Sequence, residues 1–455
     1  MNGQERIKMM GEGSVSKALF RLGVPMVFSM VVMALYNVVD TYFVSGLGTV
    51  PVAAVSVAFP FSLLFTGIGL SFGFGSGSFI SRFLGSGDPE RSVIYASTAV
   101  VASGAVAGII AVAFQIFLPD LLEVAGARGV VLPVAMGYGR WFSGALVISA
   151  VNVALGNVTV SQGAPVMTLT AMSIGALSNM VLDPLFIYVF GFGVRGAAIA
   201  TVLSQFLSLG LYVRFYRGPK TSVNIDLSRC STSVGDYVAI LKIGLSMFVS
   251  QILSALSMAL ISNKASLYGP SGVAAMGVVL RIVALGSFVV FGFVKGLQPL
   301  AGYSYGAGNG SRVRKAEKVC LIWTTSFCLL WMGVIAFFGN QVMSWFSTDP
   351  SVLKIGRKAL QVQTLLFFTF GFQFTYATLC LALGHAREGT LLTVSRQGLF
   401  LIPTLILLHA FFGLDGVIYS QAVADVLATL LTVSLIMPVR KEVDAMIRVP
   451  RESHV

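Results

Sequence analysis

The chain has 455 residues, of which 56% are hydrophobic and only 11% are charged. Soluble proteins carry roughly 25% charged residues, so this composition excludes a soluble globular protein. The formal net charge of +12 is more typical of basic loops facing anionic lipid than of a nucleic-acid-binding surface. The sequence therefore predicts an all-α polytopic membrane protein whose partners include membrane lipid and no nucleic acid.

Twelve apolar runs of membrane-spanning length follow one another along the chain. Each approaches or exceeds the ~20 residues that a helix needs to cross the hydrocarbon. In chain order they cover residues 18–44, 52–80, 93–118, 130–157, 165–191, 196–213, 238–262, 273–301, 319–346, 359–384, 390–413 and 416–438. An even number of spans places both termini on the same side of the membrane.

Lysine and arginine are unequally distributed between the two sets of loops. Of the 30 basic residues, 21 lie in the two tails and the loops after even-numbered spans, Arg396 among them, and five lie in the opposite loops. Loops rich in lysine and arginine remain in the cytoplasm. Both termini are therefore expected to be cytoplasmic, with the protein in the cell membrane.

The two halves of the chain repeat one another. A shift of 221 residues superposes Gly23 on Gly244 and Gly75 on Gly296, among other matches. Because each half has six spans, the halves share one orientation. This predicts two six-helix lobes related by a pseudo-two-fold axis along the membrane normal, as in transporters whose lobes rock about a central cavity.

The longest hydrophilic stretch separates these halves and sets the expected domain boundaries. They are an N-terminal lobe (1–213), a cytoplasmic linker (214–237), a C-terminal lobe (238–438) and a cytoplasmic tail (439–455).

Three carboxylates lie inside predicted spans: Asp40, Asp183 and Asp425. A charge at the bilayer centre costs ~2.5–3.5 kcal/mol or more, so such residues usually face a cavity and have a function. Asp40 and Asp183 both fall in the outer third of their spans. Asn179 precedes Asp183 by one helical turn on the same face, and Thr201 lies near the outer end of the next span.

Two carboxylates, an amide and a hydroxyl at one depth suit a Na⁺ ion, which prefers oxygen ligands, and equally suit a shared proton. A structural alternative is that Asp40 pairs with Arg140. Under the repeat, Asp40 falls on Ile261 and Asp183 on Thr404. Because the second half lacks both carboxylates, a coupling cation is expected in the N-terminal half.

Asp425 has no function that the sequence assigns. Arg281 lies at similar depth and Lys264 is nearby, so one expectation is a structural ion pair between Asp425 and Arg281. The roles of Lys264, Arg281 and Lys295 stay open at this point.

Three stretches resemble the multidrug and toxic compound extrusion (MATE) family, especially its prokaryotic members. They are VPMVFSMVVMALYNVVDTYFVSGLG (24–48), SQGAPVMTLTAMSIGALSNMVLDPLFI (161–187) and GLQPLAGYSYGAG (296–308). Together with the twelve spans, the resemblance covers roughly residues 18–438. It implies an exporter, not an enzyme, that uses an inward Na⁺ or H⁺ gradient to expel organic cations and other drugs. It implies no cofactor beyond the coupling ion.

The resemblance also implies roles for individual residues. The family's N-lobe cation site matches Asp40, Asn179, Asp183 and Thr201, and its first helix bends at a proline that matches Pro25. Tyr36 matches a residue that lines the N-lobe cavity. With Met33 and Met172 it would form a wall suited to flat cationic molecules through dispersion and cation–π contacts.

Two functions are alternatives to multidrug export. A flippase of lipid-linked oligosaccharide or peptidoglycan precursors would use a cationic cavity, for which Lys264, Arg281 and Lys295 are candidates. An intramembrane aspartyl protease would use two buried aspartates, but Val39 and Leu182 precede the aspartates here, and the protease motifs are not met. The choice between Na⁺ and H⁺ stays open, and each chain is expected to act as a monomer.

Overall fold

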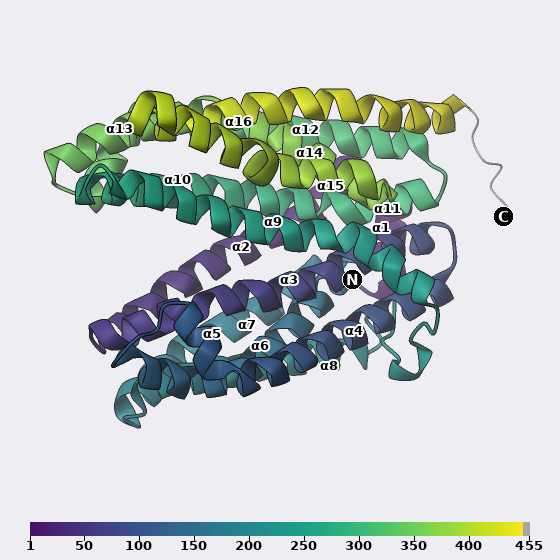
Figure 1. The fold of residues 1–455 in the computed structure, drawn as a ribbon. Helices are drawn as coiled ribbons and strands as arrows, with labels where there is room; N and C mark the ends of the chain where they lie inside the picture. Colours follow the sequence, from purple (N-terminus) through teal and green to yellow (C-terminus); the bar gives the residue numbers. More distant parts are fainter. Residues whose placement is uncertain (449–455) are drawn as a thin grey trace. The chain divides into compact units, whose positions relative to one another are not determined.

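The computed structural model describes residues 1–448, and this part of the chain is almost entirely helical (Figure 1). The helices are α1 (Gly3–Gly11), α2 (Val15–Ser45), α3 (Thr49–Gly85), α4 (Pro89–Ile116), α5 (Leu118–Val124), α6 (Val131–Ser161), α7 (Pro165–Pro184), η1 (Leu185–Val189), α8 (Gly193–Tyr216), η2 (Leu227–Arg229), α9 (Val234–Ser266), α10 (Pro270–Lys295), α11 (Leu297–Gly306), α12 (Gly310–Phe346), α13 (Pro350–Leu365), α14 (Phe367–Leu383), α15 (Ala386–Val394), η3 (Ser395–Phe400) and α16 (Leu401–Arg448).

The predicted fold class, an all-α protein with twelve membrane helices, is confirmed. Ten helices in the described residues are long and apolar enough to cross a membrane, and the pair α13 and α14, bent by 46°, forms an eleventh span. The 63-residue stretch Ala386–Arg448 is long enough for two spans. Its backbone leaves helical geometry at Gly413 (φ 58°, ψ −131°), which separates the last two spans.

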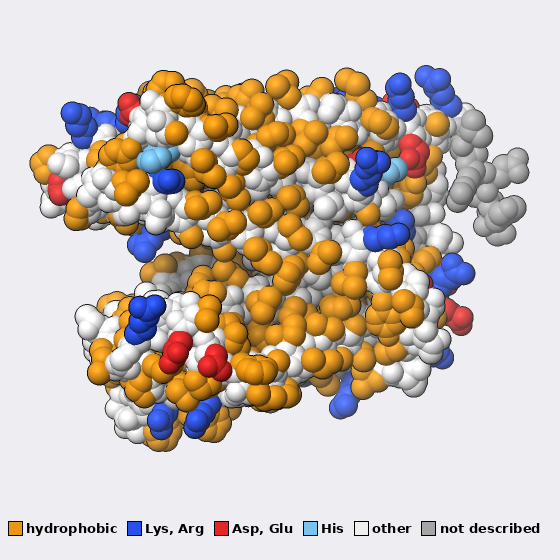
Figure 2. Space-filling model, in the orientation of Figure 1, with side chains coloured by type: hydrophobic (Ala, Val, Ile, Leu, Met, Phe, Trp, Pro, Cys, Tyr) orange, Lys and Arg blue, Asp and Glu red, His pale blue; other side chains and the backbone are white. Residues whose placement is uncertain are grey.

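Exposed side chains on these helices are predominantly apolar. Figure 2 shows hydrophobic side chains over the long sides of the helices and Lys and Arg gathered toward the helix ends. Large apolar side chains such as Phe337 (80% exposed) and Phe411 (79% exposed) have no protein cover. A surface of this kind is stable in lipid, so the protein is a multi-pass membrane protein.

The chain forms two compact units, and two helices are divided between them. Unit 1 comprises Met1–Glu12 and Phe28–Phe248, and unit 2 comprises Gly13–Val27 and the described residues from Val249 onward. The division falls after Val27 in α2 and after Phe248 in α9, two positions that the 221-residue repeat superposes. This division differs from the lobes expected from hydropathy, which place residues 13–27 in the first lobe and 238–248 in the second.

Close backbone contacts explain this division. A Cβ atom added at Gly244 of α9 would lie 1.6 Å from the carbonyl oxygen of Ser71 in α3, so the first half of α9 packs directly on unit 1. In unit 2 a Cβ atom added at Gly296 would lie 2.5 Å from the amide nitrogen of Gly23 in α2. Glycine permits both approaches because it has no side chain.

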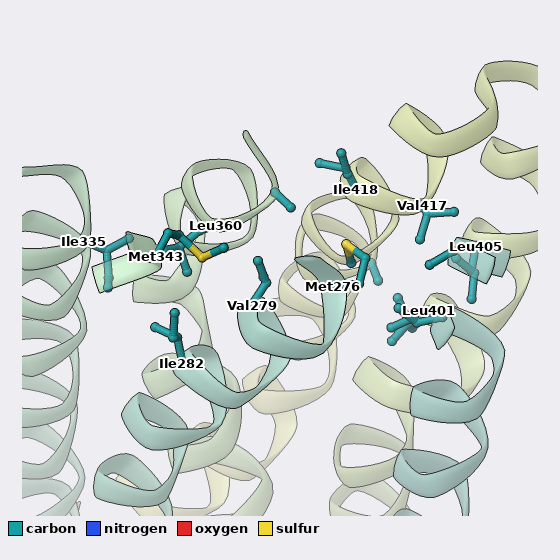
Figure 3. Close-up of a cluster of buried hydrophobic side chains, with 14 residues drawn as sticks. Met276, Val279, Ile282, Ile335, Met343, Leu360, Leu401, Leu405, Val417 and Ile418 are labelled. Atoms are coloured by element: carbon teal, nitrogen blue, oxygen red, sulfur yellow. The ribbon is translucent and has the colours of Figure 1, made fainter. Parts of the chain in front are cut away.

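Unit 1 is organised around α6, which packs against α3, α4, α7 and α8. Unit 2 is organised around α14, which packs against α11, α12, α15 and α16. A cluster of buried apolar side chains in unit 2 includes Met276, Val279 and Ile282 of α10, which meet side chains of α12, α13 and α16 (Figure 3).

The ends of the predicted linker and tail are helical. α8 continues to Tyr216 and α9 begins at Val234, so the linker between them is shorter than expected. α16 continues to Arg448, through the first residues of the predicted tail; the rest of that tail lies outside the described residues.

Candidate cation site

The C-terminal halves of α2 and α7 bring two carboxyl groups together in unit 1. Asp40 on α2 is half-buried, and Asp183 on α7 is fully buried at 0% exposure. The two carboxyl groups are direct neighbours. Two carboxylates side by side repel one another in a low-dielectric interior, so the pair is stable only when a cation or a proton lies with it.

Asn179 and Thr201 complete the polar cluster around Asp183. Asn179 is 1% exposed and Thr201 of α8 is 9% exposed. The Asn179 amide nitrogen lies 3.5 Å from the Thr201 hydroxyl, which itself donates to the carbonyl of Ala197. The structure therefore brings the four candidate residues into one cluster.

Three oxygen atoms of this cluster accept no hydrogen bond from the described residues. They are Oδ1 of Asn179 and both carboxylate oxygens of Asp183. Buried polar atoms are normally satisfied, and an unsatisfied atom costs free energy. Three unsatisfied oxygens on two residues one helical turn apart have the chemistry of a ligand set for a hard cation, and a proton would satisfy the carboxyl pair.

Two tyrosines border the carboxyl pair. Tyr36 of α2 lies beside Asp40, Asp183 and Thr201. Tyr138 of α6 is 5% exposed and lies near both carboxylates and Tyr36. Sequence reasoning identified Tyr36 and missed Tyr138, because a single tyrosine in an apolar span has no pattern that separates it from a packing residue.

The helix that carries Asp183 changes geometry immediately after it. Pro184 ends α7, and residues Leu185–Val189 form the π-helix η1. Proline lacks a backbone donor and disturbs the helical ladder, and π-helical turns are frequent at functional sites. The Tyr188 hydroxyl in η1 donates to the Phe43 carbonyl at 2.6 Å and holds the C-terminal end of α2 against η1.

The remaining candidates lie on the expected helices. Met33 on α2 is 36% exposed and Met172 on α7 is half-buried. Pro25 lies within α2, which remains helical from Val15 to Ser45. The structural alternative for Asp40 was an ion pair with Arg140. Arg140 is exposed on α6, whereas Asp40 faces Asp183.

The expected pair of Asp425 with Arg281 is wrong. Asp425 is fully buried and forms an ion pair with Arg396, whose Nε lies 2.8 Å from Oδ1. Gln421 donates to the same carboxylate at 3.0 Å, and Gln373 donates to the Asp425 backbone carbonyl at 2.9 Å. Arg396, counted above as a cytoplasmic loop residue, is only 12% exposed in the π-helix η3. The charge count grouped Arg396 with the loop residues although it lies within the predicted span 390–413, because hydropathy gives no information on helix rotation.

A second buried acid of unit 2 was also missed. Glu317 of α12 is 3% exposed and accepts hydrogen bonds from Tyr376, Arg314 and Arg440. Its sequence position next to a predicted loop suggested an exposed residue. Arg314, three residues before Glu317, was the one local sequence signal of an ion pair at Glu317.

The family model of MatE matches residues 25–185 and 243–407, one block in each half of the chain. The chain belongs to the MatE family. It is therefore a transporter of the multidrug and toxic compound extrusion type and not an enzyme.

Full-length relatives agree with this assignment. The multidrug export protein MepA of Staphylococcus saprophyticus is 25% identical over 440 residues, which cover 96% of each chain. A solved structure of a MATE protein in complex with MaL6 is 26% identical, with a TM-score of 0.89, and covers 97% of this chain and 99% of its own. A solved structure of an outward-facing multidrug resistance MATE family transporter of the MOP superfamily is also 26% identical, with a TM-score of 0.89 and coverage of 98% and 99%.

Proposed function

We propose that this member of the MatE family is a secondary active multidrug exporter of the cell membrane. It exchanges organic cations and other drugs for an inward-moving cation, Na⁺ or H⁺, by alternating access. Each chain works as a monomer, with both termini in the cytoplasm. MepA, named as a multidrug export protein, supports the drug-export part of this proposal.

One observation carries the coupling part of the proposal. Asp183 is fully buried beside Asp40, and both of its carboxylate oxygens lack a hydrogen-bond donor. A group in this position binds a cation readily, because the cation removes the repulsion and satisfies the empty acceptors. Asp40 and Asp183 hold the coupling ion in this mechanism, with Asn179 and Thr201 supplying further oxygen atoms.

Coupling follows if drug and cation prefer different conformers of the same transporter. Switching a two-state equilibrium from 1:99 to 99:1 needs ~5.5 kcal/mol of differential binding, a magnitude within reach of a buried two-carboxylate site. Asp40 lies on the part of α2 that belongs to unit 1, and Pro25 lies just before α2 passes into that unit. A bend of α2 at Pro25 would therefore move Asp40 when the cation binds.

The drug-contacting wall in this proposal is formed by Tyr36, Met33 and Met172. Tyr36 lies beside both carboxylates, so a bound organic cation meets an aromatic ring and a negative charge together. Methionine adapts to differently shaped apolar molecules, which suits a broad drug range.

The test is dye efflux from vesicles that contain the purified protein, driven by an imposed Na⁺ gradient or an imposed H⁺ gradient. Asp40→Asn and Asp183→Asn are each expected to abolish gradient-driven ethidium efflux at unchanged protein level. Asp120→Asn is the matched control, since it removes an exposed carboxylate of unit 1 on α5. Parental efflux by the Asp40→Asn protein under the same gradient would refute the site.

A further variant separates the two coupling ions. Asn179→Ala removes an oxygen that a Na⁺ shell uses and that a shared proton does not need. Loss of Na⁺-driven efflux in this variant would identify Na⁺, and retention of H⁺-driven efflux would identify H⁺. Movement of a lipid-linked sugar in place of dye would favour the flippase.

A further inference from the structure

One end of unit 2 carries a surplus of basic side chains. At this end α12 begins and α16 finishes, and the two helices lie side by side (Figure 1). Residues 310–322 and 440–448 contain seven arginine and lysine residues but only three acids. The partners of the three acids therefore decide which cations of this end stay uncompensated.

Two of the acids are bound by arginine between the helices. Glu317 of α12 is 3% exposed and pairs with Arg314 at 3.0 Å and with Arg440 of α16 at 2.7 Å. Asp444 of α16 accepts from Arg314 through both carboxylate oxygens, each at 3.0 Å. These ion pairs join α12 to α16 and leave no carboxylate of either residue for a further cation.

Three lysines beside these pairs have no protein partner. The third acid, Glu442, faces α11, where it accepts a hydrogen bond from Tyr305. Lys315, Lys318 and Lys441 are exposed. Within residues 1–448, none of the three ammonium groups takes part in an ion pair or a hydrogen bond.

The three lysines lie on one face of the α12–α16 pair. Lys315 and Lys318, three residues apart, project from the same side of α12. Lys318 directly follows Glu317, and Lys441 directly follows its partner Arg440, so the two lysines lie at the same level. Because the helices run in opposite directions, a step of about 100° per residue turns both lysines to the same side. Packed helix axes are about 8–10 Å apart, so one small anion can contact lysines of both helices.

The same face becomes apolar one helical turn away from the lysines. Ile322, one turn after Lys318, is 57% exposed, and Met437, one turn before Lys441, is 56% exposed. In the other direction Arg448, two turns after Lys441, is also exposed. Exposed apolar side chains are stable in hydrocarbon, and lysine extends its ammonium group toward water. The lysines therefore lie at the level where lipid headgroups meet the hydrocarbon.

We propose that Lys315, Lys318 and Lys441 form a binding site for the phosphate of an anionic phospholipid. The phosphate supplies the counter-charge that this face of unit 2 lacks, and the acyl chains cover the apolar surface that includes Ile322 and Met437. Binding removes the repulsion among three like charges on two contacting helices, which stabilises the contact between α12 and α16. The site is separate from the cation site of unit 1 and does not depend on the exported substrate.

The test follows thermal unfolding of the purified full chain in dodecyl maltoside micelles with increasing fractions of dioleoylphosphatidylglycerol or of neutral dioleoylphosphatidylcholine. The Tm of the parental protein is expected to rise with phosphatidylglycerol only, and the midpoint of the rise gives an apparent Kd. A lysine near an anionic lipid surface contributes a factor of about five in affinity. The triple variant Lys315→Gln, Lys318→Gln, Lys441→Gln should therefore raise this Kd about 100-fold. Its Tm in phosphatidylcholine is the baseline, so a loss of stability without anionic lipid is counted separately.

Two further triple variants separate this site from a general attraction to lipid. Replacing the same three lysines by arginine keeps the charges and should keep the Kd within about threefold. The variant Arg214→Gln, Arg217→Gln, Lys220→Gln removes three exposed basic residues at the end of α8 and in the linker of unit 1 and should leave the Kd unchanged.

Three results would overturn the proposal. The first is a parental Tm that does not respond to phosphatidylglycerol. The second is an equal loss of affinity in the two glutamine variants, which would show only a general attraction of basic loops to anionic lipid. The third is an equal Tm rise with inorganic phosphate in place of phosphatidylglycerol, which would show a site for a free anion.

Discussion

Removing the charge of Asp425 should destabilise unit 2 and leave the coupling reaction of the folded protein intact. Asp425 is fully buried and Arg396 is 12% exposed, so Asp425→Asn leaves a largely buried guanidinium without its counter-ion. Breaking a buried ion pair on one side costs about 3–5 kcal/mol. For a unit of 150–250 residues, each kcal/mol shifts Tm by about 2–4 °C, so a loss of roughly 6–20 °C is expected.

The chain contains a matched control for this experiment. Asp415 pairs with Lys358 at 2.6 Å in the same unit, but the two side chains are 52% and 45% exposed. Exposed pairs contribute about 0–1 kcal/mol, so Asp415→Asn should lower Tm by at most about 4 °C. The double variant Arg396→Met with Asp425→Leu should recover most of the loss, because it leaves no buried charge.

The assay is thermal unfolding of the detergent-solubilised protein, followed by dye efflux normalised to folded protein in vesicles. Equal Tm shifts for Asp425→Asn and Asp415→Asn would refute the stabilising role. Abolished efflux at the parental Tm would also refute the stabilising role, because it would place Asp425 in the transport mechanism.

Two further predictions follow from packing and exposure. Gly244→Ala should destabilise the protein by about 1–3 kcal/mol, because its Cβ would overlap the Ser71 carbonyl oxygen. The control Gly277→Ala, whose Cβ meets no atom within 4 Å, should not lower Tm, and equal losses of Tm in the two variants would contradict the prediction. Burial, and then the charge of Asp226, raises the pKa of the Cys230 thiol in the linker. A membrane-impermeant maleimide should therefore label Cys230 in inside-out vesicles and not in intact cells, with a rate that rises from about pH 7 to pH 9 as the thiolate forms; labelling in intact cells would reverse the proposed orientation.

The twelve spans could be predicted from the sequence alone because hydrocarbon imposes its requirement on each helix separately. A run of ~20 apolar residues satisfies that requirement whatever its neighbours are. The Asp40, Asn179, Asp183 and Thr201 cluster was also predictable to a large degree. Depth along each helix follows from residue count and direction, and the i−4 spacing places Asn179 and Asp183 on one face.

Rotation of each helix about its own axis was decided only by tertiary packing. Hydropathy predicts the depth of Asp425 but does not decide which basic residue at a comparable depth pairs with it. Helix packing places Arg396 against Asp425 and leaves Arg281 exposed. Tyr138 likewise became part of the carboxyl cluster through the orientation of α6.

The division of α2 and α9 between the two units could not be predicted from the sequence for the same reason. A hydropathy profile assigns a span to one lobe, whereas the contacts of Gly23 and Gly244 assign the two ends of each helix to different units. The sequence by itself determined which segments enter the membrane and how deep their polar groups lie, since these depend on the free energy of single residues in lipid. The partners of those polar groups depend on the contacts between helices, and only the tertiary structure decided them.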